Sequence, residues 1–205
     1  MFIDIGANEG FYTVFAAQRI GPRGVVVAVE PSPREYARLE NNVSINGFSN
    51  VSVVKQALGA RRGKAVLHVA NPEHNGQNTL GDFGHAGVTA VDHVKIDVID
   101  LDSLVQEQRL SRVDIIKIDV EGAELEVLRG GTKTLEQHKP IVLIELFDAA
   151  LRKQGASAVA VLTQLRELGY SFFEFGGSTG IPQPLEKVDP NSQNVLAVHS
   201  SRSTH

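Results

Sequence analysis

Short apolar runs alternate with helical patterns in the first part of the chain. Residues 2–5, 25–30 and 51–55 are apolar runs of strand length, while residues 11–20 and 34–45 repeat their apolar positions with the period of a helix. Because strand, helix and strand in this order form the repeating unit of a parallel sheet, the pattern predicts a βαβα beginning.

The same alternation continues toward the C-terminus. Apolar or alternating runs predict six further strands, at residues 64–69, 94–99, 113–119, 141–146, 170–175 and 194–199. Helical patterns predict three further helices, at residues 102–108, 124–138 (interrupted by Gly130 and Gly131) and 158–168. Strands that are apolar on both faces and alternate with helices are typical of a doubly wound, mostly parallel α/β sheet.

The last two predicted strands are joined by residues 176–190, which show little helical pattern. A parallel pair needs a crossover that is usually helical, so we expect the last strand to be antiparallel to its neighbour. The sequence shows no internal repeat and no linker. It therefore predicts a single domain over residues 1–199 and a disordered tail over residues 200–205.

Residues 70–92 form the longest stretch without a periodic pattern. A loop of this length in a compact domain is usually functional or disordered. Glycines favour mobility, and several polar side chains could bind a ligand: Gly76, Gly81, Gly84, Gly87, His74, Asn75, Asn78, Thr79 and His85. We expect this segment to be a substrate lid.

Composition narrows the setting and the partners. The 205 residues suffice for one core, and a formal net charge of -4 disfavours a nucleic-acid partner. The chain has no Cys, which fits a reducing compartment, and no apolar run approaches the roughly 20 residues of a membrane span. We expect a cytoplasmic protein without a membrane span that acts on a small molecule.

The first predicted strand ends in a glycine turn that contains Asp4, Gly6, Asn8 and Gly10. Ligands of open α/β sheets bind at such turns, where glycine lets them approach the backbone. A dinucleotide fingerprint would have Gly in place of Asn8, and Asp4 would repel a pyrophosphate but suit a cationic group. Glu30 ends the next strand, where an acidic residue accepts hydrogen bonds from ribose hydroxyls. A nucleoside with an amino-acid tail, such as S-adenosylmethionine, meets these demands.

Two further motifs strengthen this interpretation. Residues 116–124 read Ile-Lys-Ile-Asp-Val-Glu-Gly-Ala-Glu, and residues 127–131 read Val-Leu-Arg-Gly-Gly. Together with residues 1–13, they resemble the FkbM family of class I S-adenosylmethionine-dependent methyltransferases. The resemblance extends over nearly the whole chain, although the chain opens directly on the first strand, without the helix that such folds usually place before it. We expect an incomplete edge of the cofactor pocket there.

The resemblance implies a Rossmann-like sheet of seven strands, with the last strand antiparallel, and methyl transfer to an oxygen of a sugar, glycan or natural product. It also implies cofactor contacts. Gly6, Asn8 and Gly10 would line the methionine end, Glu30 would bind the ribose, and Gln56 and Ala57 would lie beside the adenine.

Carboxylates near the ends of two buried strands are the candidates for catalysis. Asp119 is expected to face the methyl group of the cofactor, with Glu121 and Glu124 after it and Glu145 on the next buried strand. Such a cluster can remove the acceptor's proton, or Asp119 and Glu145 could hold a cation such as Mg²⁺. His74 and His85 are further candidate bases from the loop.

Each of these residues has a structural alternative. Asp119 and Glu121 could cap the following helix, and Glu124 could be a favourable charge in its first turn. Glu145 could pair with a buried Lys or Arg, and Lys117 within a buried strand suggests a side chain that is either paired or snorkelling. At the level of function, a nicotinamide-dependent oxidoreductase and a non-catalytic cofactor-binding module remain alternatives.

Overall fold

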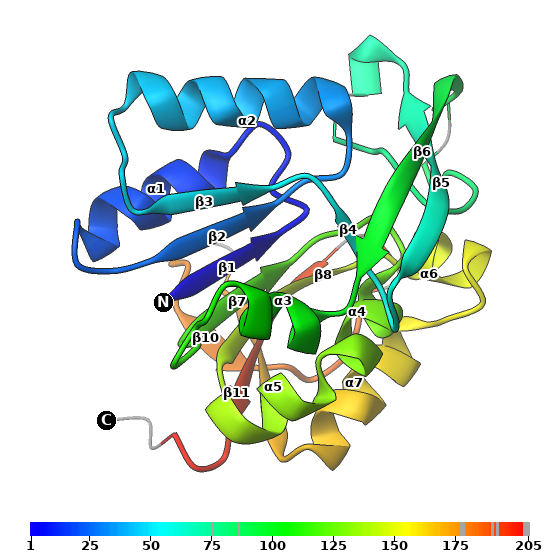
Figure 1. The fold of residues 1–205 in the computed structure, drawn as a ribbon. Coiled ribbons are helices and arrows are strands. Elements are labelled where there is room, and N and C mark those ends of the chain that lie inside the picture. The colour runs from blue at the N-terminus through cyan, green and yellow to red at the C-terminus, as the bar shows by residue number, and fades with distance from the viewer. Residues whose placement is uncertain (75, 86, 177–178, 190, 192, 203–205) are drawn as a thin grey trace.

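The computed structural model describes residues 1–74, 76–85, 87–176, 179–189, 191 and 193–202. Its main sheet has the strand order β10-β9-β11-β8-β7-β1-β2-β3 (Figure 1). Five neighbouring strands run parallel: β1 (Phe2–Ile5), β2 (Val26–Val29), β3 (Val51–Val54), β7 (Ile115–Ile118) and β8 (Ile141–Leu146). The predicted mostly parallel α/β sheet is confirmed.

The last strand, β11 (Gln193–His199), is antiparallel to both of its neighbours, β8 and β9 (Tyr170–Phe175), as predicted. The expectation of seven strands is one too few, because β10 (Pro182–Pro184) pairs with β9 as an eighth strand. Two of its three residues are proline, which lacks the N–H group of a central strand. An edge strand of this kind leaves no apolar pattern in the sequence.

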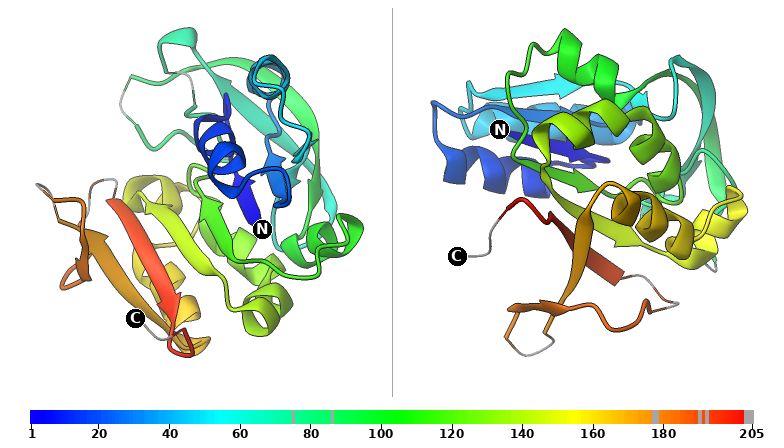
Figure 2. Two further views of the ribbon diagram at one scale, coloured as in Figure 1. Left: turned by 90° about the vertical axis from the view of Figure 1, so that its left-hand side faces the viewer. Right: turned by 90° about the horizontal axis from the view of Figure 1, so that it is seen from below.

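Helices cover both faces of the main sheet (Figures 1 and 2). One layer contains α1 (Phe11–Ile20) and α2 (Pro33–Ile45), and the opposite layer contains α3 (Leu101–Glu107), α4 (Glu124–Gly130), α5 (Thr132–His138) and α7 (Ala158–Glu167). Successive residues of a strand point to opposite faces, so Phe2 packs with the Ala16 and Ala17 side chains of α1, whereas Ile3 and Ile5 join the larger core. The short helix α6 (Asp148–Lys153) was not predicted.

A second sheet, of order β4-β6-β5, lies at the carboxyl ends of the main strands (Figure 1). It contains β4 (Ala57–Leu58), β5 (Gly63–Ala70) and β6 (Ala90–Ile99), and the 3₁₀ helix η1 (Pro72–His74) follows β5. The sequence predicted strands within β5 and β6, but β6 begins at Ala90 rather than at residue 94. The second sheet therefore borders the end of the main sheet where ligands are expected to bind.

The described part of the C-terminal segment is hydrogen-bonded to the body of the protein. Ser200 N–H donates to Gly169 O, and the Arg202 guanidinium donates to Lys139 O at 2.6 Å. Residues 203–205 of the predicted tail lie outside the described residues. No helix within the described ranges is long and apolar enough to cross a membrane.

Candidate functional site

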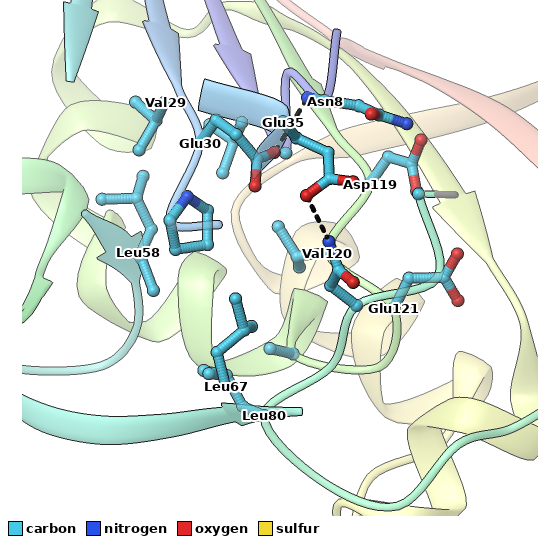
Figure 3. A pocket seen from close by; sticks show the side chains of 17 residues that line it. Asn8, Val29, Glu30, Glu35, Leu58, Leu67, Leu80, Asp119, Val120 and Glu121 are labelled. Carbon is cyan, nitrogen blue, oxygen red and sulfur yellow. Dashed lines mark hydrogen bonds between the residues drawn. The ribbon is translucent and has the colours of Figure 1, made fainter. Parts of the chain in front are cut away.

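A pocket lies at the carboxyl ends of β1, β2 and β7, beside the second sheet (Figure 3). Apolar side chains, including Leu58, Leu67 and Leu80, gather on one side, and Asp119 and Glu121 lie on the other. Of the predicted site residues, the lining includes Gly6, Asn8, Glu30, Ala57, Asp119 and Glu121. It does not include Asp4, Gly10, Gln56, His74 or Glu145.

The two glycines of the β1–α1 turn allow close packing of the protein on itself. Gly6 has a φ of +73°, and a Cβ atom there would lie 1.8 Å from Asp119 O. Gly10 has a φ of +93°, and its Cβ would lie 2.5 Å from the Leu39 Cδ1 atom of α2. Gly6 therefore brings the turn against the end of β7, and Gly10 brings α1 against α2. Only Gly6 also lines the pocket.

Glu30 follows β2 and is held by the backbone of two turns. Its Oε2 accepts from Asn8 N–H at 2.9 Å, and its Oε1 accepts from Ser32 N–H at 2.8 Å. Burial raises the pKa of Glu30 to about 7, although these two hydrogen bonds favour the carboxylate. Each oxygen can accept a further hydrogen bond, so a ligand hydroxyl in the pocket has a fixed acceptor.

Asp4 does not reach the pocket. Its side chain is fully buried on the face of the sheet that packs on α1, where Thr13 Oγ1 donates to it at 2.6 Å. Asp4 and Lys117 are partners in the register of β1 and β7, so both side chains lie on the same face, with Lys117 Nζ 3.5 Å from Asp4 Oδ1. This placement disfavours the predicted direct contact between Asp4 and a ligand amine.

Lys117 connects the two turns that border the pocket. Its ammonium donates to Gly6 O at 2.8 Å and lies 3.2 Å from Asp119 Oδ2. Burial would lower the pKa of Lys117, but Asp4 and Asp119 outweigh burial and hold it above its usual value. The expectation of a paired lysine is confirmed. A charged Lys117 fixes the Asp119 carboxylate, whose side chain is 32% exposed.

The turn between β7 and α4 decides the capping alternatives. The residue before α4 is Ala123, and the Glu124 carboxylate accepts from Val120 N–H and Gly122 N–H at 3.2 and 3.1 Å. The Asp119 carboxylate pairs with Lys117 instead and does not cap α4. Burial raises the pKa of Glu124 to about 7.

Glu121 occupies a strained position in this turn, with a φ of +52°. Burial, together with Asp119, Glu145 and Glu124, raises its pKa to about 8. A carboxyl group whose pKa lies near neutral pH is suited to accept or donate a proton during catalysis.

Glu35 is a site residue that the sequence interpretation missed. It lines the pocket, is fully buried, and accepts hydrogen bonds from Ser32 Oγ, from Arg34 Nε at 2.6 Å and from Asn78 Nδ2 at 3.1 Å. Burial acts to raise its pKa, but Ser32 and Arg34 bring it below the usual value. The spacing Ser32-x-x-Glu35 before a helical pattern is a capping-box signature that could have indicated it.

The loop between β5 and β6 packs along the mouth of the pocket. Gly76, Asn78 and Leu80 belong to the lining, and a Cβ at Gly76 would lie 2.5 Å from Asn8 Nδ2. Thr79 Oγ1 donates to Glu121 O at 2.9 Å. Asn75, one of the predicted ligand-binding groups of the loop, lies outside the described residues. The position beside the pocket is compatible with a lid, which stays a prediction.

The remaining candidates lie outside the lining. His74 ends η1 and lies near His85, and Glu145 faces Asn194 across β8 and β11. Among the described residues, no group of three or more His, Cys, Asp or Glu side chains is arranged to hold a metal ion. The proposed Mg²⁺ site at Asp119 and Glu145 is therefore unsupported, and the Lys117 ammonium is the cation beside Asp119.

The charge of the pocket restricts its ligand. Four carboxylates line it, those of Glu30, Glu35, Asp119 and Glu121, and no Lys, Arg or His occurs among the described lining residues. The lining therefore offers a pyrophosphate no cationic side chain, whereas it offers carboxylate oxygens to a cation.

Comparison with protein families decides the assignment. The model described as "Methyltransferase FkbM domain" matches residues 4–172. The chain belongs to this family. The resemblance carried by residues 1–13, 116–124 and 127–131 is thus confirmed.

Curated relatives and solved structures agree with membership of the FkbM family. Methyltransferase 1 of Beauveria bassiana is 31% identical, covering 62% of this chain and 57% of its own length. The 2-O-methyltransferase NoeI of Sinorhizobium fredii is 26% identical, covering 80% and 70%. The structure of Methyltransferase FkbM from Methylobacillus flagellatus shares the fold, with a TM-score of 0.57 and 19% identity, over 97% of this chain and 43% of that one.

A Streptococcus mutans protein in complex with SAH has a TM-score of 0.52 and 12% identity, over 96% of this chain and 86% of that one. The chain spans little more than half the length of several curated relatives that it matches.

Proposed function

We propose that this FkbM domain binds S-adenosylmethionine and transfers its methyl group to a hydroxyl oxygen of a sugar, glycan or natural product. The observation that carries the proposal is Glu30, whose two oxygens are held by backbone N–H groups at the end of β2. This is the place where α/β folds bind a ribose.

The pocket offers a matching surface to each part of this cofactor. Leu58, Leu67 and Leu80 provide an apolar surface for an adenine, on the side of the pocket away from Asp119 (Figure 3). The ribose would lie at Glu30, and the methionine end would point toward Gly6 and Asp119. S-adenosylmethionine supplies a cationic sulfonium that gives up its methyl group, and a pocket lined by carboxylates favours such a cation.

The protein's part in the reaction is to position the acceptor and take its proton. Asp119 and Glu121 line the end of the pocket where the methyl group would lie. Lys117 fixes the Asp119 carboxylate, and the pKa of Glu121, about 8, lies close enough to neutral pH for a minority of the molecules to carry the carboxylate that accepts the proton. Positioning of the acceptor supplies much of the rate in such a displacement.

The class of acceptor is suggested by distant relatives. The 2-O-methyltransferase NoeI and the hexuronic acid methyltransferase AglP of Haloferax volcanii are 26% and 28% identical to this chain. The first name specifies transfer to an oxygen and the second a sugar acid as acceptor, and together they support our proposal of an oxygen acceptor on a carbohydrate. The test is a radiolabelled methyl-transfer assay against fractionated extract of the source organism, with the products identified by mass spectrometry.

Calorimetry separates this proposal from its rivals. We expect S-adenosylmethionine and its demethylated product to bind. We expect NADH not to bind, because the lining offers its pyrophosphate no cationic side chain. Saturable NADH binding without S-adenosylmethionine binding would favour the oxidoreductase. Cofactor binding with no acceptor in any fraction, and no cellular effect of Asp119→Asn, would favour the non-catalytic module.

A further inference from the structure

His85, in the loop between β5 and β6, approaches the turn that bears Glu121. Its ring stacks on Phe147, with centroids 4.2 Å apart and planes inclined by 27°. Its Nε2 atom lies 3.5 Å from Glu121 Oε2. Phe147 directly follows β8, so three segments that are distant in sequence meet at one edge of the pocket.

The loop is held in this position by contacts that do not involve His85. Gln154 Nε2 donates to Thr79 Oγ1 at 3.1 Å and to Glu121 O at 3.0 Å, while Thr79 Oγ1 itself donates to Glu121 O. A Cβ atom at Gly84 would lie 2.7 Å from the Ala150 Cβ atom of α6, so the loop packs closely on this helix. The loop thus reaches the strained backbone of Glu121 and its carboxylate together.

We propose that His85 is a positioning residue that orients the Glu121 carboxylate, through its Nε2–H group, to accept the proton of the methyl acceptor. The proposal rests on the function proposed above and assigns a role in it to the loop. Stacking on Phe147 fixes the plane of the imidazole and so aims Nε2 at the carboxylate. His74, the other candidate base of the loop, has no such contact with a lining carboxylate among the described residues.

The step that His85 assists is the displacement that transfers the methyl group from sulfur to the acceptor oxygen. The acceptor oxygen forms a bond to the methyl carbon while the carbon–sulfur bond breaks and its electron pair stays on sulfur, which becomes a neutral thioether. The hydroxyl proton passes to the Glu121 carboxylate. His85 Nε2 lies 3.5 Å from one oxygen of that carboxylate, and a small approach of the ring would form a hydrogen bond that leaves the other oxygen free to face the acceptor.

The charged groups around Glu121 and His85 determine in which direction the pKa of Glu121 should change when His85 is replaced. The carboxylates of Asp119, Glu145 and Glu124 disfavour ionisation of Glu121, and Lys117 favours it. On the other side, burial and His74 lower the pKa of His85, so its neutral ring is a donor only through the protonated ring nitrogen. A donor on Glu121 stabilises the carboxylate, so its removal raises the pKa of Glu121 further.

The test is a titration of the Glu121 carboxyl carbon by NMR in full-length protein labelled with ¹³C-glutamate, with the signal assigned from Glu121→Gln. His85→Phe keeps a ring to stack on Phe147 and removes the donor, and we expect the pKa of Glu121 to rise by about 0.5 or more. His85→Gln offers an amide N–H and should restore part of the original value. His93→Phe, a change of the same kind on the exposed part of β6, is the control and should leave Glu121 unchanged.

The outcomes separate this proposal from the one it rests on. An unchanged Glu121 titration in His85→Phe, or an equal change in His93→Phe, overturns the role of His85. Calorimetry with S-adenosylmethionine on the same samples tests the proposed function independently, because His85 does not line the cofactor pocket. If the unmodified protein does not bind S-adenosylmethionine, the cofactor assignment is refuted, whatever the titration shows.

Discussion

The two ends of the pocket are built in different ways. At the end near Glu30, the polar groups come from consecutive turns of the first 35 residues, and these turns are linked by hydrogen bonds such as that from Asn8 N–H to the Glu30 carboxylate. The end near Glu121 joins the β7–α4 turn, the β5–β6 loop and α6, with side chains such as Gln154 bridging them. A site made from local turns leaves a motif in the sequence, whereas a site made from distant segments leaves only scattered polar residues.

The largest effect is expected from a substitution that disrupts the contact between the two ends of the pocket. Gly6→Ala places a Cβ at 1.8 Å from Asp119 O with φ at +73°, so we expect a loss of about 4 kcal/mol or more in unfolding free energy. Gly47→Ala is the matched control, because Gly47 also has a positive φ, +67°, but nothing within 4 Å of its Cβ. It should cost about 1 kcal/mol. Equal losses in urea denaturation would show that close packing at Gly6 does not matter.

Removal of the lysine that joins the two ends comes next. Lys117→Met leaves the buried Asp4 without a cation and Asp119 without its partner, and we expect a loss of about 3 kcal/mol in urea denaturation at pH 7. Lys64→Met removes an ion pair of the surface, with Asp97, and should cost less than about 0.5 kcal/mol. A cost at Lys117 as small as at Lys64 would mean that the buried pair is dispensable.

The Glu121 end should also dominate the pH dependence of stability. Burial raises the pKa of Glu121 to about 8, so between about pH 4.5 and pH 8 the folded state holds a proton that the unfolded state has lost. Stability should therefore fall as pH rises through this window, by about 1 to 3 kcal/mol between pH 6 and pH 8. Thermal unfolding at pH 6 and pH 8 measures the slope. Glu121→Gln should reduce the slope and leave the part that comes from Glu30 and Glu124, whose pKa values are also raised, to about 7. Glu126→Gln, at an exposed ion pair with Arg129, should not change it.

The smallest effect concerns cofactor affinity at the local end. Glu30→Gln replaces one acceptor oxygen by an amide and removes the charge, so we expect about tenfold weaker binding of S-adenosylmethionine by calorimetry. Glu9→Gln, whose carboxylate pairs with Arg38 at the surface and does not line the pocket, is the control. Unchanged affinity in Glu30→Gln would show that Glu30 does not bind the cofactor, and the proposed function would lose its main support.

The fold was largely predictable because strands and helices leave periodic patterns. The parallel strands, the antiparallel β11 and most helices follow from such patterns, whereas β4, β10 and α6 are too short to show a period. Gln56 and Ala57 were both predicted to lie beside the adenine, and of these two residues Ala57 lines the pocket and Gln56 does not. Gln56 lies in the short connection between β3 and β4, where no strand period determines which way a side chain points.

The sequence by itself determined the family, the βαβ beginning and the turn that contains Gly6, Asn8 and, through the next strand, Glu30. These features depend on residues close together in the chain, whose conformations are set by backbone sterics and short hydrogen bonds. Only the tertiary structure decided that Asp4 pairs with Lys117, that Glu35 lines the pocket and that His85 rather than His74 meets Glu121. Burial and the register of neighbouring strands fix these contacts, and both arise only when distant segments pack together.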